Sequence, residues 1–286
     1  MVSIVVCTRD RAELLDRCLK PLARHKGEFE VLVVDQGDTP AAIPDDSRFR
    51  RLADPGRGLA KARNIGVSAA VGSVVAFVDD DAVPDANYIG FIAKAFEENP
   101  NLAALAGRIL TLEDGRPYAR TLDNRPRVLG RGDWRRFFGG NFAIRRTVLD
   151  RIGLFDERFG AGRRWASGEE TDYFFRMQYR NCPIAYLPEA VVRHPRQAVE
   201  TPPRQLRATL FASARGQGAM FARHCMDFAN YGMVGTLAWE VGKPSLRLLE
   251  NVLALRWHRV LLFANVAWGK CVGFAEFLLQ VFRKRS

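Results

Sequence analysis

Three adjacent aspartates, Asp79, Asp80 and Asp81, directly follow the apolar run VVAFV. Carboxylates clustered at the end of a buried strand can bind a hard cation, act as a general acid or base, or cap the next helix. Asp79 and Asp81 can both reach a Mg²⁺ or Mn²⁺ ion that keeps several waters and also binds a ligand's phosphates. We favour this metal site over the alternative, in which Asp81 and Asp85 only stabilise the N-terminus of a helix beginning at about Pro84.

Two other segments carry residues that could do chemistry. The segment GEETD places Glu169, Glu170 and Asp172 before YFFRM, which predicts a helix with acids in its first turn. Taken alone, this pattern is more typical of helix N-terminal charge than of catalysis. His194 ends a short apolar run and precedes Pro195, so we expect it at the end of a strand. A single histidine more often has a structural role than a role as a metal ligand. Taken by themselves, these residues do not indicate a particular reaction.

Alternating strands and helices must position these groups. Apolar, β-branched runs predict strands and helical spacing predicts helices in the order strand 2–7, helix 11–25, strand 29–35, weaker strand 48–53, helix 59–70, strand 72–79 and helix 84–99. Such alternation is typical of a mainly parallel sheet covered by helices, in which ligands bind at the carboxyl ends of the strands. Thr8, Asp35 and Asp79 would then line one edge. Asp10 is expected to cap the first helix, with Glu13 completing a capping box.

Composition and charge narrow the class of protein. The chain has 286 residues, 48% of them hydrophobic, and five scattered cysteines without a CxxC pair, which favours a folded protein of a reducing cytosol. The start MVSIVVCTRDR resembles a first strand rather than a signal peptide. The net charge of +11 is uneven, since residues 204–286 hold twelve Lys/Arg against four Asp/Glu. Such a concentration indicates a polyanionic partner or simply a solvated basic face.

The order of the motifs is similar to that of a known enzyme family. VSIVVCTRDR, VLVVDQGD, GLAKARNIG, FVDDDAVPD, GGNFAIRR with IGLFDERFG, and GEETDYFFR follow one another at the family's spacing. Over about residues 1–200 the chain therefore resembles the inverting nucleotide-sugar glycosyltransferases of family 2. The resemblance implies a GT-A fold, a Rossmann-like mixed, mainly parallel sheet flanked by helices, in a catalytic domain of residues 1–203. The boundary is expected at Thr201–Pro203, and residues 204–286 are expected to form a helical extension.

The resemblance also implies how the nucleotide-sugar is bound. Thr8 and Arg9, in the loop after the first strand, together with Asp35, would hold the nucleotide, with the base a uracil or thymine. Arg63 matches a position that commonly faces the nucleotide; a helix-surface arginine is the alternative.

The metal site and the catalytic base follow from the same resemblance. Asp79 and Asp80 would contact the ribose or reach the metal through water. Asp79, Asp81 and His194 would hold the Mg²⁺ or Mn²⁺. The family's catalytic base aligns with Glu170, where aspartate is usual, and Asp172 is the reserve assignment.

These expectations define a function. The enzyme would move one sugar from a UDP- or dTDP-type donor to a hydroxyl of a glycan or lipid-linked glycan, with inversion. It is expected to add single sugars, because no QxxRW signature of the processive synthases follows GEETD. The loop 113–133 and the surroundings of Gly139–Asn141 are expected to select the acceptor. The alternatives are a catalytically degenerate nucleotide-sugar-binding protein, a metal phosphohydrolase and, less favoured, a basic nucleic-acid-binding protein. A Rossmann oxidoreductase is disfavoured because GxGxxG is missing.

The C-terminal third carries an apolar stretch, residues 260–282, that is long enough to span a bilayer. Lys270 and Glu276 interrupt it and would be costly in hydrocarbon. We therefore expect helices that pack on the catalytic domain, form a homodimer, or lie on an anionic membrane surface with RKRS on the headgroups. The expected location is the cytoplasm, at the inner face of the membrane if the lipid contact is made.

Overall fold

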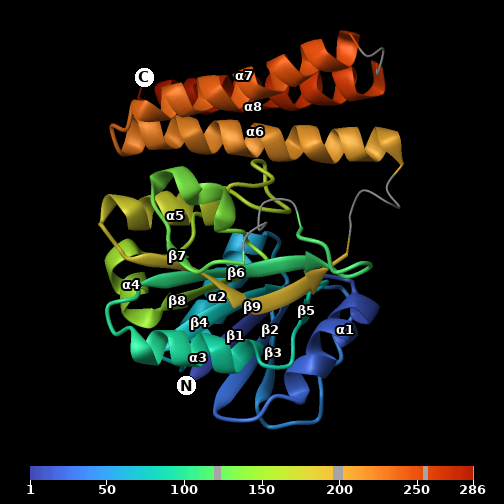
Figure 1. The fold of residues 1–286 in the computed structure, drawn as a ribbon, viewed down its shortest axis with the longest axis vertical. Helices are drawn as coiled ribbons and strands as arrows, with labels where there is room; N and C mark the ends of the chain where they lie inside the picture. The colour runs from blue at the N-terminus through green and yellow to red at the C-terminus, as the bar shows by residue number, and fades with distance from the viewer. Residues whose placement is uncertain (119–123, 196–201, 254–256, 286) are drawn as a thin grey trace. The chain divides into compact units, whose positions relative to one another are not determined.

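The computed structural model describes residues 1–118, 124–195, 202–253 and 257–285 (Figure 1). It divides into two compact units, one of residues 1–155 and 173–196 and the other of residues 156–172 and 197–286. Thr201, in the expected domain boundary, lies outside the described residues, and the division at 203/204 stays a prediction.

The first unit is an α/β fold, as the sequence predicts. Its elements in chain order are β1 (Val2–Thr8), α1 (Ala12–Ala23), β2 (Phe29–Asp35), β3 (Phe49–Ala53), α2 (Leu59–Ala69), β4 (Val74–Asp79), β5 (Val83–Pro84), α3 (Tyr88–Glu98), β6 (Ala104–Thr111), β7 (Arg127–Val128), the 3₁₀ turn Arg131–Arg136, β8 (Asn141–Arg145), α4 (Arg146–Ile152), α5 (Glu169–Tyr179) and β9 (Ile184–His194). Helix α5 crosses the division between the units, because its first turn belongs to the second one.

The strands of the described residues form one mixed sheet in the order β3-β2-β1-β4-β8-β6-β9-β5, with β7 also paired to β9. The pairs β1/β2, β1/β4, β2/β3 and β6/β9 are parallel. Strand β8 runs antiparallel to both β4 and β6, so β4, β6 and β9 point the same way. The prediction of a mixed, mainly parallel sheet is confirmed.

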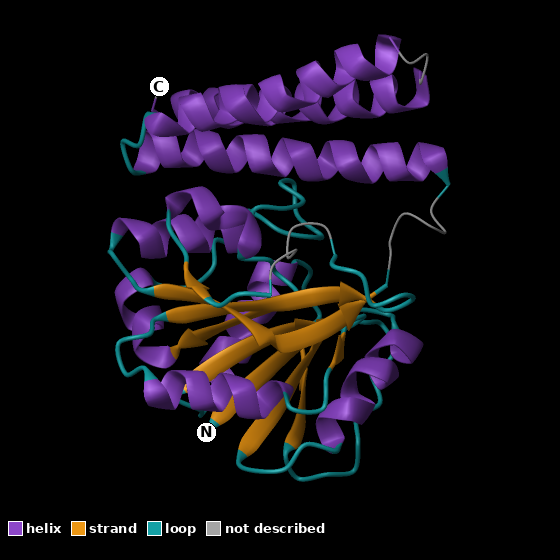
Figure 2. Ribbon diagram, in the orientation of Figure 1, coloured by secondary structure: helices purple, strands orange, loops and turns teal. Residues whose placement is uncertain are grey.

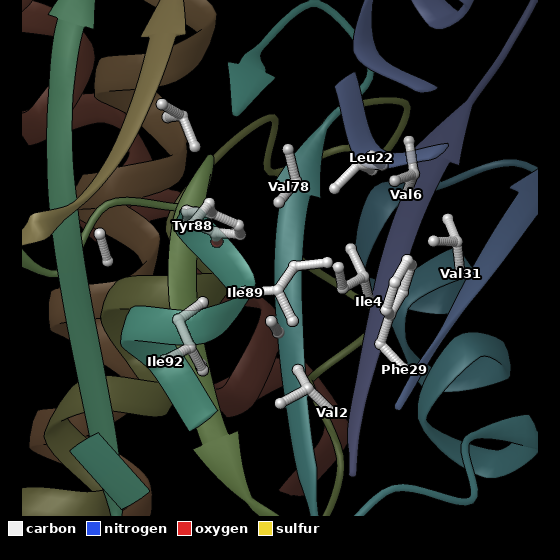
Figure 3. Packing of buried hydrophobic residues seen from close by; sticks show 14 of the residues in the cluster. Val2, Ile4, Val6, Leu22, Phe29, Val31, Val78, Tyr88, Ile89 and Ile92 are labelled. Atoms are coloured by element: carbon white, nitrogen blue, oxygen red, sulfur yellow. The ribbon is translucent and has the colours of Figure 1, made fainter. Parts of the chain in front are cut away.

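Helices pack on both faces of the sheet. On one face, alternate side chains of β1 meet α1 and α3, as Val6 beside Leu22 shows in Figure 3. On the other face, α2 approaches β1 so closely that a Cβ on Gly66 would lie 2.4 Å from Val5. Both faces of β1 are therefore buried, and its near-continuous apolar sequence is the signature of such a strand.

The register brings the polar strand ends to one edge. Thr8 pairs with Asp35, and Cys7 pairs with Asp79. His194, the last residue of β9, pairs with Thr111 at the end of β6. Because these strands are parallel, their carboxyl ends lie along the same edge of the sheet.

Two local expectations are wrong. Asp10 does not cap α1: the N-cap is Arg11, no side-chain cap bond forms, and the Asp10 carboxylate accepts the N–H of Asp38 at 2.9 Å. Pro84 does not open a helix either, because Val83 and Pro84 form β5 against β9, and α3 begins at Tyr88. In both cases a contact distant in sequence overrides the local signal.

The second unit is helical, as expected, and its three long helices run alongside one another: α6 (Pro203–Asp227), α7 (Gly232–Leu253) and α8 (Trp257–Arg285) (Figure 2). Helices α6 and α8 touch backbone to backbone, because a Cβ on Gly218 would lie 1.9 Å from the carbonyl oxygen of Lys270. The stretch Leu261–Arg283 of α8 is long and apolar enough to cross a membrane, judged by length and composition alone.

Candidate functional site

Three side chains at the carboxyl edge of the sheet form a metal-compatible cluster. Oxygens of Asp79 and Asp81 and a ring nitrogen of His194 all lie within 4.8 Å of one another. Strand β4 supplies Asp79, the following turn supplies Asp81, and β9 supplies His194. Carboxylate oxygens with one imidazole suit Mn²⁺, and the oxygens also suit Mg²⁺. The donor set therefore fits the metal that the sequence predicts.

Each of the three aspartates faces a cation from another element. Asp80 accepts from Arg11 Nη1 at 3.1 Å, and Asp81 Oδ1 lies 3.0 Å from His194 Nε2. Arg63 Nη2 lies 3.6 Å from Asp79 Oδ1. Clustered like charges next to a buried strand would otherwise be unfavourable, so these cations explain how the acidic triplet is tolerated.

Burial and these partners shift the ionisation of the cluster. Burial raises the pKa of Asp79 to about 6, with the charge of Arg63 opposing it. Burial would also raise the pKa of Asp81, but the hydrogen bond and charge of His194 outweigh it and lower that pKa. Burial would lower the pKa of His194, yet the hydrogen bond and charge of Asp81 raise it to about 9. The cluster thus holds a proton between Asp81 and His194 that a metal ion would have to displace.

The predicted nucleotide-binding residues lie in different environments along this edge. Thr8 is buried and donates its hydroxyl to Asp80 Oδ2 at 2.8 Å. Arg9 is partly exposed, with Nε 3.5 Å from the carboxylate of Asp10. Asp35 accepts the N–H groups of Gly37 and Ala41, at 2.9 and 2.8 Å, and also the guanidinium of Arg51. Asp35 therefore organises the loop after β2, and its role in base binding stays a prediction.

The bonds to Asp35 give a test by pH. Burial opposes its ionisation, but the N–H groups of Ala41, Gly37 and Arg51 outweigh burial and lower its pKa below the usual 3.8. The ionised carboxylate therefore stabilises the fold fully above pH 3.8, and this contribution is lost as pH falls through the lower folded pKa. We expect Asp35→Asn to cost about 1–3 kcal/mol at pH 7, and progressively less in acid.

Urea unfolding from pH 7 downwards measures this, with Asp38→Asn as the matched control because Asp38 is exposed in the same loop. Equal stability of Asp35→Asn and the native protein at pH 7 would contradict the assignment.

Arg63 and the segment Gly139–Asn141 (GGN) lie close to Asp79 of the cluster. Arg63 is 2% exposed, donates to the carbonyl oxygen of Gly139 at 2.9 Å and packs against the rings of Phe142 and Phe155. It is thus not a helix-surface arginine. A Cβ on Gly140 would lie 2.6 Å from Asp79 Oδ2, so glycine is needed there for close approach.

Asn141 is a structural residue in this arrangement. It is fully buried, accepts from the hydroxyl of Tyr88 at 3.0 Å, and donates to the carbonyl oxygens of Arg108 and Ala190 at 2.9 and 2.8 Å. These bonds span the register shift between Gly107 and Arg108, where β6 and β9 change pairing. Acceptor selection by the residues around it stays a prediction, and residues 119–123 of the predicted acceptor loop lie outside the described residues.

Sequence reasoning missed two residues of the cluster. The sequence pattern assigns Arg11 only to a helix, yet its guanidinium faces Asp80 and Asp81. A basic residue shortly after the first strand, in a chain with clustered acids after another strand, is the signal that could have indicated this contact. Tyr118 has its ring centroid 5.0 Å from that of His194 and 6.0 Å from that of Phe138. No local pattern predicts this contact, because it depends on how the loop after β6 folds back.

The acids of GEETD separate into different environments within the second unit. Asp172 is fully buried, and its Oδ1 accepts from Arg223 and lies 3.0 Å from His224 Nε2. Glu169 is 4% exposed, whereas Glu170 is half-buried in the first turn of α5. Asp172 therefore joins the first turn of α5 to α6 within the second unit, and the role of Glu170 as the catalytic base stays a prediction.

Comparison with known proteins decides the family. Residues 3–164 match the model described as Glycosyl transferase family 2, which is more than half of the chain. The chain belongs to glycosyltransferase family 2. The predicted family is thus confirmed.

Curated relatives of this glycosyltransferase differ in size and activity. It is 29% identical over 209 residues to the pre-mycofactocin glycosyltransferase of Mycobacterium tuberculosis, covering 68% of this chain and 42% of the relative. It is 25% identical over 228 residues to the chondroitin synthase of Pasteurella multocida, covering 63% and 23%. This glycosyltransferase thus spans less than half of either relative.

A solved structure confirms the GT-A fold. The mannosyltransferase PcManGT from Pyrobaculum calidifontis, in complex with GDP-Man and Mn²⁺, matches with a TM-score of 0.60 at 17% identity. The match covers 96% of this glycosyltransferase and 86% of PcManGT. At this identity the likeness concerns the fold alone.

Proposed function

We propose that this glycosyltransferase moves a single sugar from a nucleoside-diphosphate sugar to a hydroxyl acceptor, with inversion and with Mg²⁺ or Mn²⁺ as cofactor. The observation that carries the proposal is the convergence of Asp79, Asp81 and His194 at the carboxyl edge of the sheet. A divalent ion held there would neutralise the charge that develops on the departing nucleoside diphosphate. PcManGT, with the same fold, carries Mn²⁺ and a nucleotide-sugar.

The remaining edge residues are proposed to bind the rest of the donor. Thr8, Arg9 and Asp35 would face the nucleotide, and Asp80 the ribose. Arg63 is better described as a positioning residue, because its buried guanidinium holds Gly139 and lies beside Asp79. A UDP- or dTDP-sugar is the proposed donor, and GDP-mannose belongs in the same screen because PcManGT was solved with it.

Glu170 is proposed as the catalytic base. Its carboxylate would take the proton of the acceptor hydroxyl as that oxygen attacks the anomeric carbon, opposite the bond to the leaving diphosphate. The attack forms the new glycosidic bond while the old bond breaks, so one displacement inverts the anomeric configuration. The acceptor is proposed to be a glycan or a lipid-linked glycan, met in the cytoplasm.

A donor screen tests the proposal. The protein is incubated with UDP-, dTDP- and GDP-sugars, Mn²⁺ or Mg²⁺ and simple glycosides, and the anomeric configuration of any product is read by NMR. We expect one nucleotide class to be used, a single sugar to be added, and no turnover with chelator. Retention of configuration, or turnover unaffected by chelator, would contradict the mechanism.

A second candidate function rests on one observation: glutamate occupies position 170, where the family usually has aspartate. A degenerate protein would bind the nucleotide-sugar with metal but transfer nothing. Donor binding without turnover across the screen would favour this alternative. Donor hydrolysis independent of any acceptor would instead favour a phosphohydrolase.

A further inference from the structure

Between positions 261 and 282, helix α8 turns its two charged side chains, Lys270 and Glu276, toward its neighbours. Lys270 is 5% exposed and donates to Glu240 of α7 at 3.0 Å, and Glu240 is itself 3% exposed. Glu276 accepts from Arg215 Nε of α6 at 2.9 Å. The two charges that interrupt the apolar stretch are thus neutralised by partners on α6 and α7.

The outward face of α8 is apolar. Between positions 261 and 282, every exposed side chain is apolar. Up to position 279 these side chains belong to Leu261, Ala264, Trp268, Cys271, Ala275 and Leu279. Their spacing of three or four residues places them on one face of the helix, called here the outer face. Trp268 is 66% exposed and Leu279 57%. A surface helix of a water-soluble protein normally turns its apolar side chains toward the core and its polar side chains toward solvent. An exposed apolar face such as the outer face is typical of a surface that binds another molecule or a membrane.

Cations lie at both ends of the outer face. At the N-terminal end, Leu261 lines a hollow together with Phe211, Asn265 and Arg207, and Arg207 is exposed. At the C-terminal end, the exposed Arg283 lies in the last turn of the helix, and the sequence continues with Lys284 and Arg285. An apolar face with tryptophan and with basic residues at its ends is typical of a helix that lies in a membrane interface.

The net charge of the chain favours an anionic membrane surface over a second copy of the chain as the partner of the outer face. Residues 204–286 carry twelve Lys/Arg against four Asp/Glu, within a total net charge of +11. A second copy would bring the same positive charge to the face, whereas anionic headgroups complement it. A spanning α8 would face lipid all round, but its inner side is occupied by α6 and α7 and their ion pairs.

We propose that the outer face of α8 lies in the surface of an anionic lipid bilayer, with the helix in the plane of the interface. The inference goes beyond the proposed transfer reaction and does not depend on it. Leu261, Trp268 and Leu279 enter the boundary between headgroups and acyl chains, while the basic residues at the two ends contact anionic headgroups.

Flotation of the full chain with vesicles tests the proposal. We expect the protein to float with vesicles of phosphatidylcholine and phosphatidylglycerol at low salt, and much less with phosphatidylcholine alone. High salt should weaken the binding and alkaline carbonate should remove it, because the contact is peripheral. No flotation with anionic vesicles would overturn the proposal, and carbonate-resistant binding would replace it with a spanning helix.

Variants separate the apolar contact from net charge. Trp268→Glu and Leu279→Glu each put a carboxylate on the outer face, and we expect about tenfold or greater loss of vesicle partitioning. Val71→Glu is the matched control, because Val71 is 64% exposed in the first unit and the charge change is the same. All three should keep the thermal midpoint of the native protein.

Two outcomes would contradict the outer face as a lipid contact. An equal loss in Val71→Glu would show that only net charge matters. A dimer in lipid-free solution that Trp268→Glu dissociates would show that a second copy covers the face.

Discussion

Glu170→Gln should abolish most of the transfer activity while leaving donor binding intact. The amide is nearly isosteric with the carboxylate but cannot accept the proton of the acceptor hydroxyl, and positioned general bases contribute about 10²–10⁴-fold to rate. We therefore expect kcat to fall by about that factor, with an unchanged Kd for the nucleotide. Steady-state kinetics and calorimetry on the same preparation measure both quantities.

Two variants control for this result. Glu170→Asp restores the residue usual in the family, one methylene shorter, and should keep measurable turnover. Asp172→Asn should act on stability instead, because it removes the charge of a fully buried carboxylate that accepts from Arg223 and lies 3.0 Å from His224 Nε2. Arg223 keeps Asp156 and Asp227 as partners, so we expect a cost of about 1–3 kcal/mol. If Glu170→Gln turns over near normally, the base lies elsewhere and Asp172 becomes the next candidate.

Asp81→Asn should remove the metal dependence of donor binding. It takes one oxygen ligand from the cluster and also leaves His194 without its partner, whose carboxylate lies 3.0 Å from the ring nitrogen. Metal ions supply several kcal/mol of transition-state charge stabilisation, so kcat/KM should fall by about 10²-fold or more.

Electron paramagnetic resonance of added Mn²⁺ reports the loss directly, because bound and free ions give different signals. Asp16→Asn is the control, since Asp16 is an exposed acid on α1. Native-like Mn²⁺ binding by Asp81→Asn would show that the cluster is not the metal site.

The residues at the carboxyl edge of the sheet could be predicted from the sequence because local sequence patterns mark the strand ends. Apolar runs that end in polar residues identify strand ends, and parallel pairing then brings Thr8, Asp35 and Asp79 to one side. The sequence likewise predicts His194 at a strand end. Its pairing with Asp81 depends on the placement of β9 beside β6, which no local pattern gives.

The failures share a physical cause, which is contact between residues distant in sequence. Asp10 has the composition of an N-cap, but its carboxylate is taken by the backbone of Asp38 in another loop. Pro84 is typical of a helix start, yet β9 pairs with it as a strand. No periodicity reveals such partners, because the chain segments that supply them lie far away in sequence.

In the C-terminal helices, too, the direction in which charged side chains point depends on contacts that the sequence pattern does not reveal. Lys270 and Glu276 look like interruptions of an apolar stretch, and only the packing of α6, α7 and α8 shows that both charges turn inward. The outer face of α8 is therefore more uniformly apolar than the sequence suggests.

Calorimetric titration of the native protein with UDP, dTDP and GDP tests whether Asp79, Asp81 and His194 form a metal-dependent nucleotide site. Each nucleotide is titrated with Mn²⁺ and again with chelator. We expect one nucleotide to bind with Mn²⁺ and to lose its heat of binding with chelator. Equal binding in both conditions, or binding of none, would contradict it.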